Sequence, residues 1–151
     1  MKRKKIKLYT IGFTGKSAEA FFTLLTEAGV QKLIDTRINN SSQLSGFAKA
    51  SDLEYFLEKI GGIAYEYNVE FAPTKELLSD YREKQIDWSA YEKKYVSLLK
   101  ERNVASFAHN AVYLNASCFL CSEHEPDHCH RRLLAEYLHQ INTSIEIIHL
   151  M

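Results

Sequence analysis

One short run of residues has the side chains for chemistry: Cys129, His130, Arg131 and Arg132, eight residues after Cys121. The run follows an apolar segment and opens a helical pattern. A helix start presents unpaired N–H groups and the positive end of the helix dipole, and both favour an anion or a thiolate. Neighbouring histidine and arginine side chains lower the pKa of a thiol further. The run therefore predicts a reactive thiol, with Cys129 as the candidate nucleophile.

The residues beside Cys129 supply the other groups that such chemistry needs. His130 can accept the thiol proton, and Arg131 with the helix N–H groups can hold an anionic substrate or an oxyanion. Adjacent helical residues point about 100° apart, so we expect either Arg131 or Arg132 to face the site and the other to face solvent. The alternative for Cys129 is a small apolar residue that fills space between loop and helix.

Cys121 and Glu123 extend this candidate site. Cys121 ends an apolar run, where it is either a core residue or a second thiol beside Cys129, acting as a resolving thiol or a metal ligand. Glu123 lies between the two thiols and can orient an imidazole, act as acid or base, or pair with an arginine. The alternative for Glu123 is a solvated loop carboxylate.

Three cysteines and six histidines also invite a zinc interpretation. Cys118 and Cys121 form a C-x₂-C pair, but residues three apart in a strand point to opposite faces, and a second pair at zinc-finger spacing is missing. We therefore predict no metal and no cofactor, and keep a Cys/His metal-binding protein as an alternative. Its ligands would come from the loop residues Cys121, His124, His128, Cys129 and His130.

The elements that must position these residues alternate along the chain. Apolar runs predict strands over 6–12, 30–36, 63–67, 116–121 and 144–149. Helical spacing predicts helices over 17–29, 51–60, 74–84, 88–102 and 131–140, and a short one over 104–114. Strands that alternate with helices imply a parallel sheet covered on both faces. We predict an α/β fold: a single three-layer domain over residues 1–151 with a mostly parallel sheet of about five strands.

Ligands of such sheets bind outside the carboxyl ends of the strands. Asp35 and Arg37 close the second strand, and residues two apart share one side of an extended segment. A buried Asp35 needs a partner, for which an arginine from the cysteine loop is one candidate; the alternative is a local salt bridge. Further distinctive residues fall at strand ends: Gly12, Thr14, Tyr67, Cys121, Glu123 and His149.

Composition restricts the partners. Nineteen basic and nineteen acidic residues cancel, so the chain lacks the basic footprint of a protein that coats nucleic acid; duplex binding would need a local patch of residues 2–5 with Arg131 and Arg132. No apolar stretch approaches the roughly 20 residues that cross a bilayer, and none resembles a signal-peptide core. We expect no membrane contact, a cytoplasmic location, and reduced cysteines that serve chemistry or metal binding rather than disulfides.

Taken together, the motifs resemble the family called domain of unknown function 488 (DUF488), over nearly the whole chain. The resemblance rests on Tyr9-Thr10-Ile11-Gly12, Leu33-Ile34-Asp35-Thr36-Arg37, Ser42 with Gly46-Phe47-Ala48, Cys121-Ser122-Glu123 with Cys129-His130-Arg131, and His149. Phe13 stands where members often carry histidine, which removes one acid/base group. The resemblance implies a site built on Cys and His, with no settled activity, substrate or cofactor.

We expect a thiol-centred enzyme that acts on a phosphate- or carboxylate-bearing substrate, which includes small anions and nucleotides. A non-catalytic module that binds phosphate, a nucleotide or nucleic acid is the alternative. The expected catalytic residues are Cys129, His130, Glu123 and Asp35, and the expected substrate-binding residues are Arg37, Arg131, Gly12, Thr14, Cys121 and Tyr67.

Overall fold

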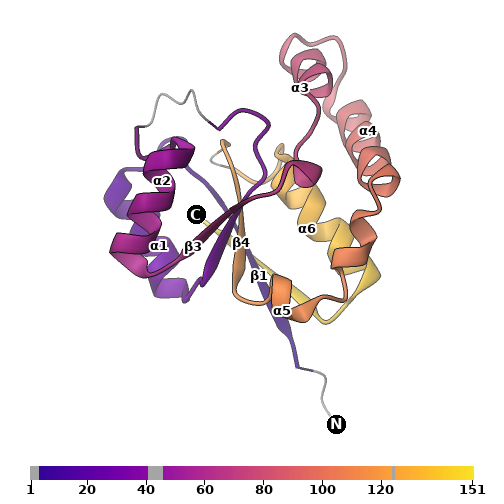
Figure 1. Cartoon of the computed structure of the whole chain (residues 1–151). Coiled ribbons are helices and arrows are strands. Elements are labelled where there is room, and N and C mark those ends of the chain that lie inside the picture. The colour runs from indigo at the N-terminus through magenta and orange to yellow at the C-terminus, as the bar shows by residue number, and fades with distance from the viewer. Residues whose placement is uncertain (1–3, 41–45, 124) are drawn as a thin grey trace.

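The structure is a computed structural model that describes residues 4–40, 46–123 and 125–151. At its centre is a parallel sheet with the strand order β3-β2-β4-β1-β5 (Figure 1). The strands are β1 (Ile6–Gly12), β2 (Lys32–Asp35), β3 (Ala64–Tyr67), β4 (Ser117–Cys121) and β5 (Ile145–Leu150). The predicted α/β fold with a parallel sheet is confirmed.

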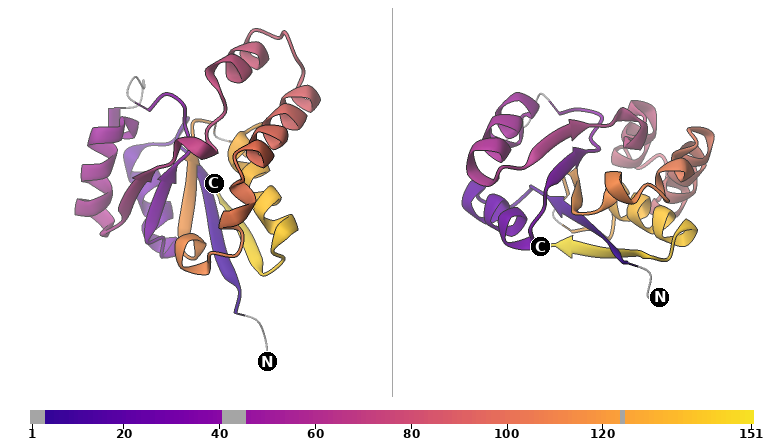
Figure 2. Two further views of the ribbon diagram at one scale, coloured as in Figure 1. Left: turned by 45° about the vertical axis from the view of Figure 1, so that its right-hand side comes forward. Right: turned by 60° about the horizontal axis from the view of Figure 1, so that its bottom comes forward.

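Helices cover both faces of this sheet. One face carries α1 (Ala18–Ala28) and α2 (Ala50–Phe56), which continues into the π-helical turn η2 (Leu57–Gly61). The other face carries α4 (Trp88–Glu101) and α6 (His130–Ile141), and α3 (Lys75–Arg82) stands above the sheet edge (Figure 2). Shorter segments are α5 (Ala111–Leu114) and the 3₁₀ turns η1 (Gly46–Ala48), η3 (Val69–Phe71) and η4 (Val104–Phe107).

Local sequence signals set most of these boundaries. The Ser17 side chain accepts the Ala20 N–H at 3.1 Å, and Gly29 closes α1 in the left-handed conformation at φ 77°. One expectation was too simple, because the segment 104–114 is not a single helix. It divides into η4 and α5 where the Asn110 side chain caps the second turn.

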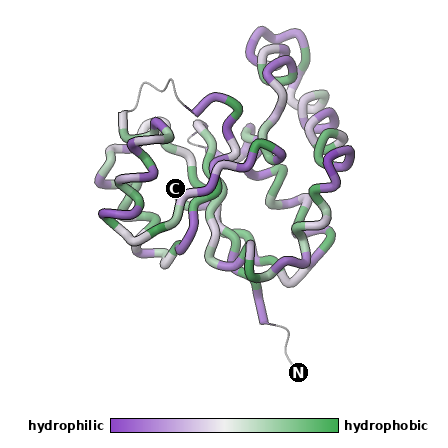
Figure 3. The backbone as a smooth tube through the Cα atoms, in the orientation of Figure 1, coloured by the Kyte–Doolittle hydropathy of each residue, from purple (hydrophilic) through white to green (hydrophobic). Residues whose placement is uncertain are grey.

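The core consists of two layers because successive residues of a strand face opposite sides. Leu8, Ile34 and Phe119 pack against α4 and α6, whereas their neighbours Leu33 and Leu120 pack against α1 and α2. Figure 3 shows the turn after α3, at the top of the view, as hydrophilic.

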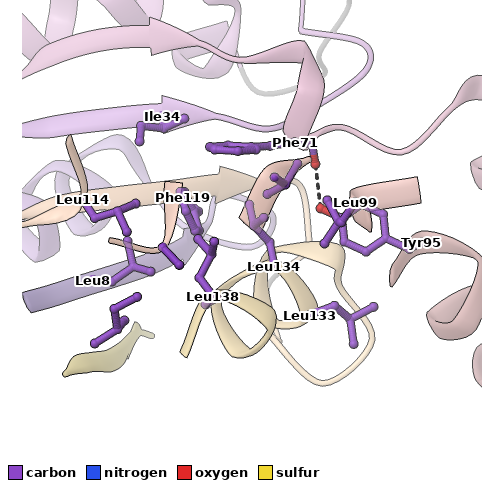
Figure 4. Close-up of a cluster of buried hydrophobic side chains, with 14 of the residues drawn as sticks. Leu8, Ile34, Phe71, Tyr95, Leu99, Leu114, Phe119, Leu133, Leu134 and Leu138 are labelled. Carbon is purple, nitrogen blue, oxygen red and sulfur yellow. Dashed lines mark hydrogen bonds between the residues drawn. The ribbon is translucent and has the colours of Figure 1, made fainter. Parts of the chain in front are cut away.

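A buried hydrogen bond ties the α4 layer to the chain after β3. Tyr95 donates its hydroxyl to the carbonyl of Phe71 at 2.6 Å (Figure 4). Tyr95 is fully buried, so this bond satisfies two polar groups inside an otherwise apolar layer.

The connections between strands and helices place a crevice at the carboxyl ends of the strands. The chain leaves β2 toward the α2 face and leaves β4 toward the α6 face, and these two strands are neighbours. Ligand sites of parallel α/β sheets lie at such a switch point, outside the carboxyl ends of the strands. Within the described residues, no helix combines the length and the apolar character needed to span a bilayer.

Candidate functional site

A cavity of about 580 Å³ lies at the carboxyl ends of β1, β2 and β4. The strand ends contribute Phe13 to Gly15, Arg37 to Asn39 and Cys121 to Glu123, while the start of α6 contributes His128 to His130. Side chains of α3 and α4 form the opposite wall, among them Tyr81, Trp88 and Tyr91. The switch point between β2 and β4 is therefore hollow and lined by the predicted cysteine residues.

Cys121 and Cys129 both line this cavity and are joined by a disulfide. The expectation that these two cysteines are reduced is therefore wrong for this structure. The physical reason is the course of the β4–α6 loop, which folds back so that the end of β4 and the start of α6 present their sulfur atoms to each other. The spacing of eight residues did not indicate this turn.

Cys118 has a different environment from the other two cysteines. It is a free thiol on β4 that packs in the apolar layer under α1 and α2. Complete burial raises its pKa well above the usual range of a thiol. Cys118 is therefore a core residue, as its position in a strand pattern suggested.

His130 is held in one tautomer by the chain after β2. Its Nε2 lies 2.8 Å from the carbonyl oxygen of Thr36 and 2.9 Å from the Thr36 hydroxyl. Because a carbonyl oxygen only accepts, Nε2 carries the proton and Nδ1 is left as the basic nitrogen. Burial lowers the pKa of His130 to about 4, so the ring is neutral near pH 7.

Arg131 lies behind the disulfide rather than in the cavity wall. It is fully buried, and its Nη1 donates to the sulfur of Cys121 at 3.1 Å and to the carbonyl of Glu123 at 2.5 Å. Its Nε donates to the hydroxyl of Thr10 at 3.3 Å, and that hydroxyl lies 2.6 Å from Nδ1 of His149. Burial lowers the pKa of Arg131 to about 10, which still leaves a cation beside the sulfur at neutral pH.

The Arg132 side chain points away from Arg131 toward the surface, as the 100° step between adjacent helical residues predicted. It pairs with Glu136 at 2.7 Å and donates to the carbonyls of Pro126 and Asp127. These contacts fix the loop before α6 and leave the cavity to other residues.

Asp35 finds its partner within its own segment. Arg37 donates to its carboxylate through Nε and Nη2, each at 2.8 Å, and Tyr65 donates its hydroxyl at 2.6 Å. The partner is thus Arg37 and not an arginine of the cysteine loop. The reason is reach: the two side chains leave the end of β2 on the same side, and both are buried there.

Arg37 retains one unused donor in the cavity wall. Its Nη1 is buried and has no hydrogen-bond partner within the residues that the structure describes. The ring of Phe13 lies 5.3 Å from the guanidinium carbon and covers one of its faces. A buried cationic donor without a partner carries a desolvation cost that an anionic ligand would remove.

The remaining predicted residues divide into two groups. Thr14 and Glu123 line the cavity, and Gly12 lies directly under the loop: a Cβ there would meet the Glu123 carbonyl oxygen at 1.6 Å. Tyr67 instead lies on the edge strand β3, is 40% exposed and donates to the carbonyl of Ile38 at 3.4 Å. It does not belong to the described cavity lining.

The sequence reasoning missed the aromatic wall and Thr36. Trp88 packs on the ring of His128 at 4.9 Å and stacks on Tyr91 at 5.1 Å. These residues were assigned to packing, and no local signal shows that α3 and α4 lean over the sheet edge. His124 and Ser42, a possible ligand and a motif residue, lie outside the described residues.

The fold and the cavity define an α/β protein with a cysteine pair and a buried arginine at the switch point of a parallel sheet. The family model described as "Domain of unknown function DUF488" matches residues 17–138. The chain therefore belongs to the DUF488 family, as the motifs indicated. Neither the curated proteins nor the solved structures give a match.

Proposed function

We propose that the protein is a thiol-centred enzyme that acts on a phosphate- or carboxylate-bearing substrate in this cavity. The observation that carries the proposal is the buried, unpartnered Nη1 of Arg37, a residue that lines the same cavity as Cys129. An anionic group on Nη1 would hold the rest of the substrate against the cysteine pair.

The surrounding residues suit this chemistry once the cysteines are reduced. Cys129 is the residue before α6, and although it is only 3% exposed it lines the cavity, so a substrate there would meet its thiol beside the helix start. A ring nitrogen of His130 lies within 4.8 Å of both sulfur atoms. The free Nδ1 of the neutral ring can accept the thiol proton, and Thr36 keeps the ring in place.

Alkylation of the reduced protein with iodoacetate and iodoacetamide tests the proposal, because the two reagents differ in charge. We expect iodoacetate to modify Cys129 faster, by roughly tenfold, which corresponds to one charge-assisted hydrogen bond. Inorganic phosphate should slow the reaction. Peptide mass spectrometry identifies the modified residue, and buried Cys118 serves as the internal control that stays unmodified in the folded protein.

Arg37→Lys is the matched variant, since it keeps a cation for Asp35 but has no third nitrogen to offer the cavity. We expect it to abolish the preference for iodoacetate. Equally slow alkylation of Cys129 and Cys118, or a preference that survives in Arg37→Lys, would refute the proposal.

A non-catalytic anion-binding module uses the same Arg37 donor and differs only in lacking turnover. Nucleic acid is the weaker version of this alternative, because Arg132 is engaged with Glu136 and the loop carbonyls. Lys2 and Arg3 of the basic cluster lie outside the described residues. Oligonucleotide binding that falls steeply with salt would favour this alternative.

A metal site is a second candidate, supported by one cluster. The sulfur atoms of Cys121 and Cys129 and a ring nitrogen of His130 lie within 4.8 Å of one another. The contact of His130 Nε2 with the Thr36 carbonyl resembles the outer hydrogen bond that orients metal-bound histidines. Reduced cysteines would give zinc three protein ligands and one open position. Elemental analysis of the reduced protein, with Cys129→Ser as control, decides between one bound zinc and none.

A further inference from the structure

We infer that Cys121 and Cys129 form a working dithiol–disulfide couple, and that its reaction partner is a small thiol carrying an anionic group. The inference rests on the proposed function, because it uses the Arg37 donor to select the partner. It goes beyond that function by naming the substrate class and the reaction, which is thiol–disulfide exchange.

The disulfide lies toward the weaker end of the stabilisation that cross-links give a fold. It closes a short loop, with a sequence separation of eight, and the entropy that a cross-link removes from the unfolded chain grows with loop length. The same loop is already fixed by other bonds. Thr14 N–H donates to the Ser122 carbonyl at 3.0 Å, and Arg131 binds the carbonyl of Glu123. Because other bonds already hold this loop, the disulfide can open and close in a reaction without the loop losing its fold.

The two sulfur atoms are not equivalent. Cys121 has the Nη1 of Arg131 at 3.1 Å, a buried cation that stabilises negative charge developing on that sulfur. Cys129 lies at the start of α6 beside the cavity. In exchange reactions the better-stabilised thiolate leaves faster, so an incoming thiol should attack Cys129 and release Cys121.

The exchange balances in two steps. A substrate thiolate attacks the sulfur of Cys129, forms a mixed disulfide with it, and the electron pair of the broken Cys121–Cys129 bond goes to Cys121 as thiolate. A second substrate thiolate attacks the substrate sulfur of the mixed disulfide and releases Cys129 as thiolate. Two substrate thiols are thereby oxidised to their disulfide, the protein gains two electrons, and the two protons pass to the cysteines or to solvent.

Two small thiols of equal length and opposite charge provide the test: 2-mercaptoethanesulfonate and cysteamine. The oxidised protein is mixed with each at equal thiolate concentration, quenched with N-ethylmaleimide, and analysed by peptide mass spectrometry. We expect the sulfonate to open the Cys121–Cys129 bond at least about tenfold faster. The Arg37→Lys variant should react with both thiols at similar rates.

Two cysteine variants test the direction of attack. In Cys121→Ser, the disulfide of 2-mercaptoethanesulfonate should leave a stable mixed disulfide on Cys129, because the resolving thiol is missing. In Cys129→Ser, the same reagent should label Cys121 at least about tenfold more slowly, since the Arg131 cation against Cys121 makes its thiolate a weaker nucleophile.

Failure of this inference is separable from failure of the proposed function. If treatment with diamide leaves both cysteines free, or if the two thiols open the bond equally fast, the couple is refuted. The iodoacetate preference of reduced Cys129 does not require the bond and would still stand. Loss of charge preference in both experiments would remove the anion site itself, and with it the proposed function.

Discussion

Arg37 forms a two-point ion pair with Asp35, although the two residues stand only two positions apart and both are buried. Two of the three guanidinium nitrogens are fixed on the carboxylate, and the third is buried without a partner in a residue that lines the cavity. Because Tyr65 also donates to Asp35, the carboxylate and therefore the guanidinium have one orientation. The ion pair thus holds the remaining donor, Nη1 of Arg37, in one fixed orientation.

Breaking this pair on one side should destabilise the protein strongly. In Arg37→Gln the Asp35 carboxylate stays buried with the Tyr65 hydroxyl and the backbone N–H of residue 37 as donors but without a cation, and we expect a loss of about 3–5 kcal/mol of unfolding free energy. The double variant Asp35→Asn/Arg37→Gln removes both charges and should lose less than the single variant. Urea unfolding of Arg37→Gln, Asp35→Asn and the double variant gives the coupling energy between the two charges. Additive losses would show that the two charges do not interact.

The neutral His130 ring should make the protein sensitive to mild acid. The folded pKa of about 4 lies below the unfolded value, so the unfolded chain takes up the proton first and stability falls as the pH drops below about 6.5. We expect His130 alone to account for about 2 kcal/mol of the stability lost between pH 7 and pH 5. In His130→Gln, which keeps a donor for the Thr36 carbonyl, this part of the pH dependence should disappear. Urea midpoints at both pH values measure it.

Gly12 should tolerate no side chain. A Cβ would meet the Glu123 carbonyl oxygen at 1.6 Å and Arg131 Nη1 at 2.9 Å, so Gly12→Ala must push the β4–α6 loop away from the end of β1. We expect a loss of about 3 kcal/mol and altered alkylation of Cys129. Gly46→Ala is the control, because nothing lies within 4 Å of its Cβ position. Equal melting temperatures for the two variants would contradict this.

The hydroxyl of Tyr95 should contribute to the stability of the α4 layer. Tyr95→Phe leaves the Phe71 carbonyl without its donor inside the core, and we expect a loss of about 1–2 kcal/mol. Tyr137→Phe is the control, because this ring is partly buried and its hydroxyl makes no hydrogen bond within the described residues; it should stay within about 0.5 kcal/mol of the parent. Thermal unfolding of both variants makes the comparison.

The strands and most helices could be predicted because their signals are local. An apolar run that ends in glycine, a serine cap and a left-handed glycine each act within a few residues. The parallel sheet follows from the alternation of those elements. Where a boundary differed, as in the segment 104–114, a side-chain cap competed with the helical pattern.

For the site, the sequence could predict which residues stand at the end of a strand or the start of a helix, but not the contacts between different elements. The alternation of elements placed Arg37 after a strand and Cys129 at a helix start, and both line the cavity. The choice of Arg37 as partner of Asp35 depended on side-chain reach, and the aromatic wall depended on how α3 and α4 lean over the sheet. Tyr67 was included because it ends a strand, but β3 is the edge strand on the far side of β2 from β4, and Tyr67 is absent from the described cavity lining.

Because β1 is an interior strand of the sheet, any fragment that is to fold must include it. The family match begins at residue 17 and ends at residue 138, yet β1 lies between β4 and β5 and carries Gly12 under the loop. A fragment trimmed to the matched residues would lose β1 and β5 and leave β4, a fully buried strand of five residues, as an exposed edge that is prone to aggregation. Expression boundaries should therefore enclose residues 6–150.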